Sequence, residues 1–294
     1  MSLDADCQET MKTVISASRR TDLPAFFPEF LAASVKAERA AVKGPRGRVR
    51  DVDLSPGAVH TIVLWSKNFS RLLGNEAGLR DALRKYDQIY ALLTVTGLGG
   101  TRVERGAPRP GEALAQLPAL VELAGDPRRV SLRFDPVVFW RERGGVTTNL
   151  DFFGRVAEAA AAARLTDVRF SLAQWYGKAL RRAWLTGFDL IDPAEEDKLE
   201  VARRLAGIAA ERGLKLHACA QGFLARVPGV APSACIDGRL LEALHPRHEP
   251  ASTAKDKGQR RECGCTASID IGSYAQPCGH GCVYCYAMRS DPER

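Results

Sequence analysis

The chain has 294 residues, of which 45% are hydrophobic and 26% are charged, and this composition suits an ordinary globular protein with a full hydrophobic core. No run of about 18 or more apolar residues is present, and the first 15 residues carry acidic side chains rather than a basic stretch and an apolar run, so we expect neither a transmembrane helix nor a secretory leader. The formal charge of +7 permits an acidic partner without requiring one, so nucleic acid is possible but not indicated. We expect a cytoplasmic protein that makes no membrane contact.

Short apolar runs rich in β-branched residues alternate with longer helical patterns along the chain. The runs predict strands at Thr13–Ser18, Thr61–Trp65, Ile89–Val95, Val130–Phe134, Asp167–Leu172 and Leu214–Cys219. Most of these runs are almost continuously hydrophobic, which is typical of parallel strands that are covered by helices.

The patterns between the strands predict helices at Ala25–Ala40, Gly111–Ala124, Leu150–Arg164 and Pro193–Arg212. This alternation implies a parallel sheet with right-handed crossovers, either an open doubly wound sheet or a barrel. No feature reverses the strand order, so the sequence favours an α/β fold with a partial parallel βα barrel of about six βα units. We expect this barrel to occupy residues 1–245.

Polar side chains gather where the predicted strands end, which is where barrels of parallel strands place their reacting groups. They include Ser18–Asp22, Ser66–Asn68, Thr94, Thr96, Arg133, Asp135, Gln174, Tyr176 and Lys178. A polar loop residue taken alone is more often solvent-facing than catalytic. Arg133 is the strongest candidate, because an arginine inside a hydrophobic run must face a polar cavity or a partner.

After Leu244 the sequence becomes polar and rich in turn residues, and we expect residues 246–294 to form a cysteine-rich tail docked on the barrel. Seven of the eight cysteines lie beyond residue 218. Without a secretory leader, clustered thiols favour metal binding over disulfides. Cys7 lies apart in a polar segment and is expected to be a free thiol.

Cys278, Cys282 and Cys285 form a C-x3-C-x2-C pattern with an aromatic residue before the last cysteine. Three thiolates this close can hold three corners of a cubane iron–sulfur cluster, and Gly279 and Gly281 supply the backbone freedom to do so. One iron would then lack a nearby cysteine and could bind a small molecule. The alternative is a zinc knuckle completed by His280 or by a distant ligand.

A second set of thiols comprises Cys219, Cys235, Cys263 and Cys265. Four thiolates can fully coordinate a second [4Fe-4S] cluster or a structural zinc ion, and the sequence does not choose between them. The cluster is favoured, because the predicted cluster in the tail already requires iron and sulfide. The alternative for Cys219 is an ordinary small buried residue.

The segment from Cys278 to Tyr286 resembles the C-x3-C-x-aromatic-C signature of the radical S-adenosylmethionine (SAM) superfamily, and in particular the corresponding loop of spore photoproduct lyases. From Ala17–Asp22 to the tail, the chain resembles a bacterial family, domain of unknown function 1848. The superfamily resemblance implies a [4Fe-4S] cluster whose fourth iron is chelated by SAM, and a 5′-deoxyadenosyl radical formed when an electron splits SAM. It also implies a partial βα barrel and a position for Tyr284 near the adenine.

The order of the elements differs from that of most of the superfamily, in which the cysteine loop follows the first strand. Here the cysteine loop, Cys278–Cys285, comes last. Either the barrel is circularly permuted, with Ile269–Ile271 as the strand before the loop, or the tail folds back over the barrel mouth.

We therefore expect a radical SAM enzyme that acts on an unknown substrate and receives electrons from a donor such as flavodoxin or ferredoxin. The candidate catalytic residues are Arg133, Asp135 and Lys67, and the candidate cofactor-binding residues are Tyr284, Arg20 and Thr96. The alternatives are a non-catalytic zinc or iron–sulfur protein that binds nucleic acid, and an electron carrier that does not use SAM.

Overall fold

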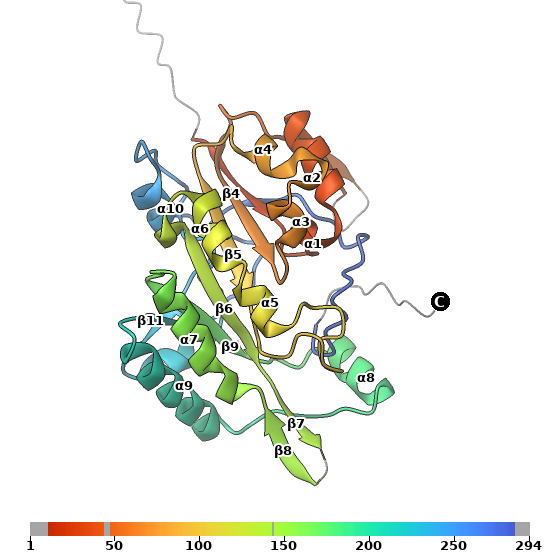
Figure 1. The fold of residues 1–294 in the computed structure, drawn as a ribbon, viewed down its shortest axis with the longest axis vertical. Helices are drawn as coiled ribbons and strands as arrows, with labels where there is room; N and C mark the ends of the chain where they lie inside the picture. The colour runs from red at the N-terminus through yellow and green to blue at the C-terminus, as the bar shows by residue number, and fades with distance from the viewer. Residues whose placement is uncertain (1–10, 44–47, 143, 286–294) are drawn as a thin grey trace, which may run out of the picture.

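The computed structural model describes residues 11–43, 48–142 and 144–285. Its main feature is an eight-stranded sheet in the order β12-β11-β9-β6-β5-β4-β1-β13, in which all neighbouring strands run parallel (Figure 1). The strands are β1 (Thr13–Ala17), β4 (Val59–Ser66), β5 (Ile89–Thr94), β6 (Val130–Val137), β9 (Asp167–Leu172), β11 (Lys215–Cys219), β12 (Val230–Ser233) and β13 (Ile269–Asp270). The predicted α/β class and parallel sheet are confirmed, and within the described residues the edge strands β12 and β13 do not pair to close the sheet.

All six predicted strands are present, and they are neighbours in the sheet in chain order from β1 to β11. Strand β5 shows why these runs are hydrophobic throughout. Ala91 and Leu93 belong to one buried cluster, whereas Tyr90 and Leu92 belong to another. Because successive side chains of a strand point to opposite faces, both faces of the sheet must be covered.

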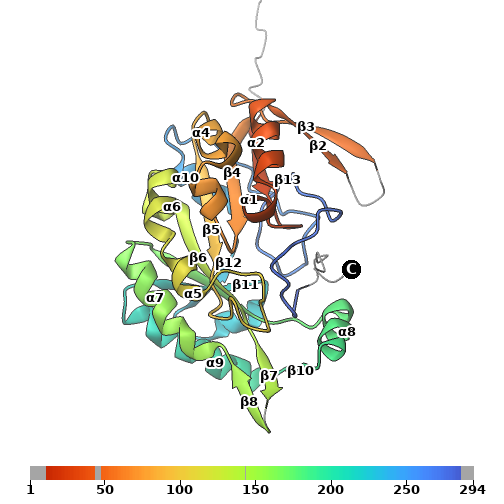
Figure 2. The same ribbon diagram turned by 45° about the vertical axis from the view of Figure 1, so that its right-hand side comes forward.

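Helices cover one face of the sheet and enclose the larger core (Figure 2). They are α2 (Pro28–Lys36), α4 (Leu79–Leu83), α6 (Leu117–Ala124), α7 (Phe153–Ala162) and α9 (Glu195–Ala210). Helix α10 (Gly238–Leu244) and the segment around Ala251, Cys263 and Cys265 pack on the opposite face. The remaining helices are α1 (Leu23–Phe26), α3 (Ser70–Leu73), α5 (Pro110–Leu114) and α8 (Gly177–Leu185).

The predicted helix boundaries need correction in the first half of the chain. The helix expected at Ala25–Ala40 is divided into α1 and α2 at Pro28, which cannot donate a backbone hydrogen bond, and it ends at Lys36. Strand β2 (Arg39–Lys43) then pairs antiparallel with β3 (Val49–Asp53). The helix expected at Gly111–Ala124 is likewise divided into α5 and α6.

The helices expected at Leu150–Arg164 and Pro193–Arg212 correspond to the shorter helices α7 and α9. A small antiparallel sheet in the order β10-β7-β8 was not predicted. Its strands are β7 (Phe139–Glu142), β8 (Gly145–Thr148) and β10 (Asp189–Ile191), which are too short for a clear periodic pattern. No helix in the described ranges has both the length and the apolar character needed to span a bilayer.

The C-terminal tail is part of the main sheet. Strand β13 pairs parallel with β1, with Ile269 opposite Ile15 and Asp270 opposite Ser16. Ile271 is 1% exposed and belongs to the larger core. The residues expected to form a strand before the cysteine loop therefore do so, at the edge of the sheet next to β1.

Candidate functional site

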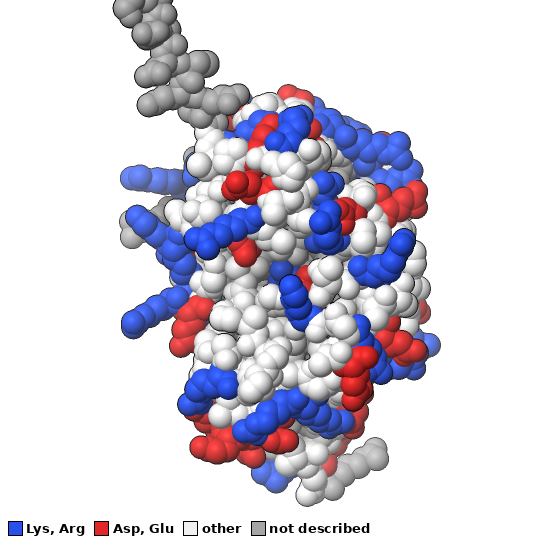
Figure 3. Space-filling view, turned by 90° about the vertical axis from the view of Figure 1, so that its left-hand side faces the viewer, with Lys and Arg blue, Asp and Glu red and all other residues white. Residues whose placement is uncertain are grey.

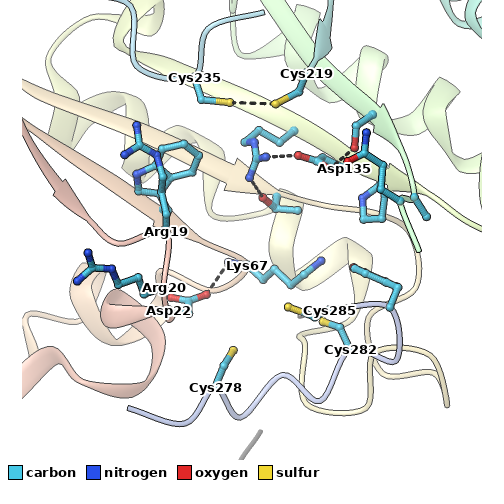
Figure 4. A pocket seen from close by; sticks show the side chains of 18 of the residues that line it. Arg19, Arg20, Asp22, Lys67, Asp135, Cys219, Cys235, Cys278, Cys282 and Cys285 are labelled. Atoms are coloured by element: carbon cyan, nitrogen blue, oxygen red, sulfur yellow. Dashed lines mark hydrogen bonds and ion pairs between the residues drawn. The ribbon is translucent and has the colours of Figure 1, made fainter. Parts of the chain in front are cut away.

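A cavity of about 310 Å³ opens at the C-terminal ends of the parallel strands. All seven cysteines beyond residue 218 line it. Figure 4 shows Cys219 and Cys235 on one side and Cys278, Cys282 and Cys285 on the other, with Lys67 and Asp135 between them. Its other lining residues include Ser18, Arg19, Arg20, Thr21, Asp22, Trp65, Thr94, Arg133, Ser171, Gln174, Tyr176, Gln259, Arg260, His280 and Tyr284. Most of the polar strand-end residues named from the sequence line this cavity, but Asn68, Thr96 and Lys178 do not. Cys7 lies outside the described residues.

The end of β13 fixes the start of the cysteine loop. The Asp270 carboxylate accepts hydrogen bonds from the Ser16 and Ser18 hydroxyls at 2.9 and 2.7 Å and from the backbone N–H of Arg19 at 2.7 Å. A Cβ on Gly272 would lie 2.0 Å from the Ser18 oxygen, so only glycine fits there. The chain after β13 is therefore held tightly against the loop that follows β1.

The cysteine loop packs closely against residues 103–106. The Gly106 N–H donates to the His280 carbonyl, and the Val283 N–H donates to the Val103 carbonyl, both at 3.0 Å. A Cβ on Gly106 would lie 2.0 Å from the Gly279 carbonyl oxygen, and a Cβ on Gly279 would lie 2.5 Å from the Phe26 ring. Close packing, rather than backbone conformation, therefore requires glycine at 279.

The other glycine of the loop has a conformational role. Gly281 has a φ of 64°, in the left-handed region that glycine tolerates best. It turns the chain between Cys278 and Cys282, so that both sulfur-bearing residues face the same cavity.

His280 is not available as a metal ligand. Its Nε2 lies 2.7 Å from Asp22 Oδ2, and its Nδ1 lies 3.1 Å from the Gly106 carbonyl oxygen. The ring also stacks edge-on against Phe26, with 4.6 Å between centroids. A zinc knuckle completed by His280 would have to break one of these buried contacts, so that alternative does not fit the structure.

The spacing of potential ligand atoms also bears on the kind of metal site. In the described ranges, one group of three acidic, histidine or cysteine residues has all its ligand atoms within 4.8 Å of one another, and it consists of Asp87, His245 and Glu249. This group lies outside the cavity. Ligands of one tetrahedral zinc, with Zn–S bonds of about 2.3 Å, lie about 4 Å apart. A cubane cluster instead binds each thiolate through a different iron, and so suits more widely separated sulfurs.

The Asp87, His245 and Glu249 group is better explained by charge pairing. Lys12 lies 2.9 Å from Glu249, and Arg247 lies 2.5 Å from Asp87. These ion pairs lower the pKa of Glu249 to about 2, through hydrogen bonds from Lys12 and Arg247. The two carboxylates are already neutralised, so we do not assign a metal to them.

Glu104 organises the side chains behind the cysteine loop. It is 1% exposed and accepts hydrogen bonds from Lys67 Nζ at 3.0 Å, from Thr96 Oγ1 at 2.6 Å and from the Tyr284 hydroxyl. Burial alone would lower the pKa of Lys67, but Glu104 and Cys282 raise it above its usual value. Lys67 therefore stays charged beside the loop.

Arg133 connects the cavity wall to the second set of cysteines. Its side chain is 16% exposed, it donates to Thr94 Oγ1 at 3.2 Å, and it pairs with Asp135. Its guanidinium lies 5.1 Å from the centre of the Trp65 ring. Burial would lower the pKa of Arg133, but Asp135 and the sulfurs of Cys235 and Cys219 raise it. The prediction that this arginine faces a polar cavity is confirmed.

The structure brings the four cysteines of the second set to one wall of the cavity. Cys219 ends β11, and its Sγ lies 3.7 Å from that of Cys235, far beyond the disulfide length of about 2.0 Å. Cys265 accepts a hydrogen bond from the Ile236 N–H, and a hydrogen bond from Cys265 lowers the pKa of Cys263 to about 7. Cys219 therefore faces another cysteine instead of standing alone among apolar side chains.

Two buried arginines lie beside this set, and each also pairs with a carboxylate, Arg133 with Asp135 and Arg169 with Asp167. Cys235 helps to raise the pKa of both Arg133 and Arg169, against the opposing effect of burial. The Nε atoms of both arginines are buried without a hydrogen-bond partner. Four thiolates around a dipositive metal centre carry about −2, so these residues suit a metal–thiolate site in both charge and donor capacity.

A comparison with known families places the chain. The family model described as "Domain of unknown function (DUF1848)" matches residues 14–287. The chain belongs to this family. No curated protein matches it. The match covers both cysteine sets, every residue that lines the cavity and all but the first residue of the main sheet.

Five of the six candidate catalytic and cofactor residues of this DUF1848 protein line the cavity. They are Lys67, Arg133, Asp135, Arg20 and Tyr284. Thr96 does not, because it is 1% exposed and its hydroxyl donates to Glu104 behind the wall. Thr96 can instead help to hold Glu104 in place. Asp22 was named among the polar residues after the first strand, but not as a catalytic or cofactor residue. Glu104 was not predicted, since it does not lie at the end of a predicted strand.

The close approach of Gly106 to the cysteine loop gives a selective test. Gly106→Ala should displace the loop and lower the iron content of anaerobically reconstituted protein, because its Cβ would overlap the Gly279 carbonyl at 2.0 Å. Gly111→Ala is the matched control, since nothing lies within 4 Å of a Cβ there. Iron and circular dichroism should be measured on both. Equal iron in Gly106→Ala and Gly111→Ala would show that this packing does not hold the loop.

The second set should behave as a single centre. Replacing Cys219, Cys235, Cys263 or Cys265 with serine should remove the same equivalents of metal each time. Each change should also cost about 3 kcal/mol of stability, because a metal shared by the four cysteines would close a loop of about 45 residues. Elemental analysis and thermal melts test this, with Cys7→Ser as the control. Four unrelated metal contents, or melts like that of the wild type, would contradict a shared centre.

Proposed function

We propose that this protein is a radical SAM enzyme acting on a substrate still to be identified. In this proposal Cys278, Cys282 and Cys285 hold a [4Fe-4S] cluster, and the second set of cysteines holds a second [4Fe-4S] cluster or a zinc ion. The observation that carries the proposal is that three cysteines face one cavity while both nitrogens of the neighbouring His280 are engaged elsewhere. Such a loop supplies three ligands and leaves the fourth position to a molecule in the cavity.

The chemistry would come from the bound cofactors. A cluster held by Cys278, Cys282 and Cys285 would supply the one electron needed to cleave the S–C5′ bond of SAM, which would give methionine and a 5′-deoxyadenosyl radical able to take a hydrogen atom from the substrate. The protein supplies binding, orientation and exclusion of water. A cavity of about 310 Å³ falls within the usual range of small-molecule sites.

The order of the strands supports the permuted version of the partial barrel. Counted from β13, the chain gives a strand, then the cysteine loop, and then the parallel strands β1, β4, β5, β6, β9 and β11 in sequence across the sheet. This is the superfamily order implied by the resemblance, with the first strand moved to the end of the chain. In this proposal the open sheet is the wall of a partial βα barrel.

Charged side chains lie where bound cofactors would need them. Lys67 is next to Cys282 and is held by Glu104, so it can neutralise the cluster or hold the SAM carboxylate. Asp135 accepts a hydrogen bond from Ser171 and pairs with Arg133, and it can accept from ribose hydroxyls. Arg133 lies nearer the second set than the loop, so its role extends to that centre.

Binding of nucleic acid has no comparable support. Figure 3 shows one face of the molecule, on which basic and acidic side chains are interspersed rather than forming a continuous basic track. Arg19, Arg20, Lys67 and Arg133 line the cavity itself, where they can serve a small anionic ligand.

The proposal is tested by SAM cleavage. Anaerobically reconstituted protein reduced with dithionite should slowly form 5′-deoxyadenosine and methionine even without substrate. Cys282→Ala should reduce the yield by more than about tenfold because it removes a cluster ligand, and Arg133→Ala should reduce it less. Chromatography measures the product, and Cys7→Ala is the control. Equal yields from wild type and Cys282→Ala, or one zinc per chain with no iron at this loop, would overturn the proposal.

A further inference from the structure

Helix α8 packs directly on the cysteine loop. Ala183 shares a buried cluster with Val283 of the loop. Arg182 donates to the carbonyl oxygens of Cys282, at 3.3 Å, and of Cys285. Figure 2 shows α8 at the edge of the molecule, apart from the helices that cover the sheet. The inner side of α8 is therefore part of the wall that supports the loop.

The outer side of α8 is apolar and exposed. Leu180, Trp184 and Leu185 are 45%, 78% and 67% exposed, and the four-residue spacing of Leu180 and Trp184 places them side by side. With Tyr176, four of the eight large hydrophobic residues that are exposed in the described ranges lie between residues 176 and 185. A concentration of this kind marks an interaction site.

The charge on this helix has one sign. Lys178 and Arg181 are exposed, and no carboxylate of the described residues forms an ion pair with either of them. The sequence of α8, GKALRRAWL, contains no acidic residue. An apolar ridge with only positive charges beside it is complementary to an acidic partner surface.

We propose that the outer face of α8 is the docking surface for a small acidic protein that carries one electron at a time. This inference rests on the proposed function, because it assigns the route by which the cluster at Cys278, Cys282 and Cys285 is reduced. The carrier loses one electron and the cluster gains it, with no atom transferred. A flavodoxin hydroquinone would become a semiquinone in this step.

The position and character of the surface suit this partner. A carrier on α8 would lie against the element that contacts the carbonyls of Cys282 and Cys285, so the electron has a short path. Transient redox complexes bury less than about 1,200 Å², which a single helix and its surroundings can supply. Trp184 is the expected centre of the contact, since tryptophan is enriched among residues that dominate binding energy.

The test compares a protein reductant with a chemical one. Formation of 5′-deoxyadenosine is measured with a reduced bacterial flavodoxin and, separately, with dithionite, on Trp184→Ala and on Lys178→Glu/Arg181→Glu. Both variants should lose about tenfold in the flavodoxin-driven rate and nothing in the dithionite-driven rate. Arg155→Glu/Arg203→Glu, on α7 and α9, makes the same change in net charge at exposed positions and should match the wild type.

The outcomes separate this inference from the proposed function. An unchanged flavodoxin-driven rate in the α8 variants would overturn the docking surface alone. Binding of α8 to vesicles of anionic lipid would also overturn the docking surface, and so would a dimer of this chain that dissociates on Trp184→Ala. If dithionite yields no product, the proposed function fails, and calorimetric titration of flavodoxin still decides the docking. Weaker binding of flavodoxin to Lys178→Glu/Arg181→Glu than to the wild type would support the docking surface. Equal binding to both proteins, or no binding to either, would overturn it.

Discussion

The contact between Asp22 and His280 is the interaction on which the arrangement of the cavity depends. Asp22 is 8% exposed, and both of its carboxylate oxygens are used. One oxygen caps α1 through the Ala25 N–H at 3.0 Å, and the other accepts from His280 and from the Lys67 N–H at the end of β4. A buried carboxylate with three partners is costly to disturb. It joins the cysteine loop to two neighbouring strands of the sheet.

This contact also decides what the loop can bind. Because His280 is committed to Asp22 and Gly106, the loop offers its three thiols and no imidazole to a metal. Burial raises the pKa of Cys278 to about 12 and raises that of Cys282 well above its usual value, so without a metal both thiols are protonated at neutral pH. Metal binding must displace those protons, and nearby cations such as Lys67 favour the resulting thiolates. A metal bound here, as we propose, would supply positive charge that stabilises the thiolates.

Much of the fold could be predicted because it depends on local pattern. Six strands were identifiable because burial on both faces requires continuous hydrophobic runs, and Arg133 stood out as a cation within one of them. Strand β13 has only two residues, so its pairing with β1 depends on tertiary contacts more than on its own sequence. The same holds for α8, whose only buried residues are Ala179 and Ala183.

The site could be predicted only in part, for the same reason. Cys278, Cys282 and Cys285 are recognisable from their spacing, and they line one cavity together with the other four cysteines beyond residue 218. Asp22 and His280 are 258 residues apart, and no local signal connects them. Glu104 lies in a turn-rich loop, and its role depends on the hydrogen bonds that Tyr284, Lys67 and Thr96 donate to it in the folded protein. Long-range contacts of this kind depend on the register of the whole sheet.

The central claim is that a cluster at Cys278, Cys282 and Cys285 leaves one iron open to SAM in the cavity. The most direct measurement is the electron paramagnetic resonance spectrum of the reduced Cys235→Ser variant, in which the second centre is removed, recorded with and without SAM. The account predicts a [4Fe-4S] signal whose g values shift when SAM is added, because the cofactor binds the open iron. Identical spectra with and without SAM would contradict it.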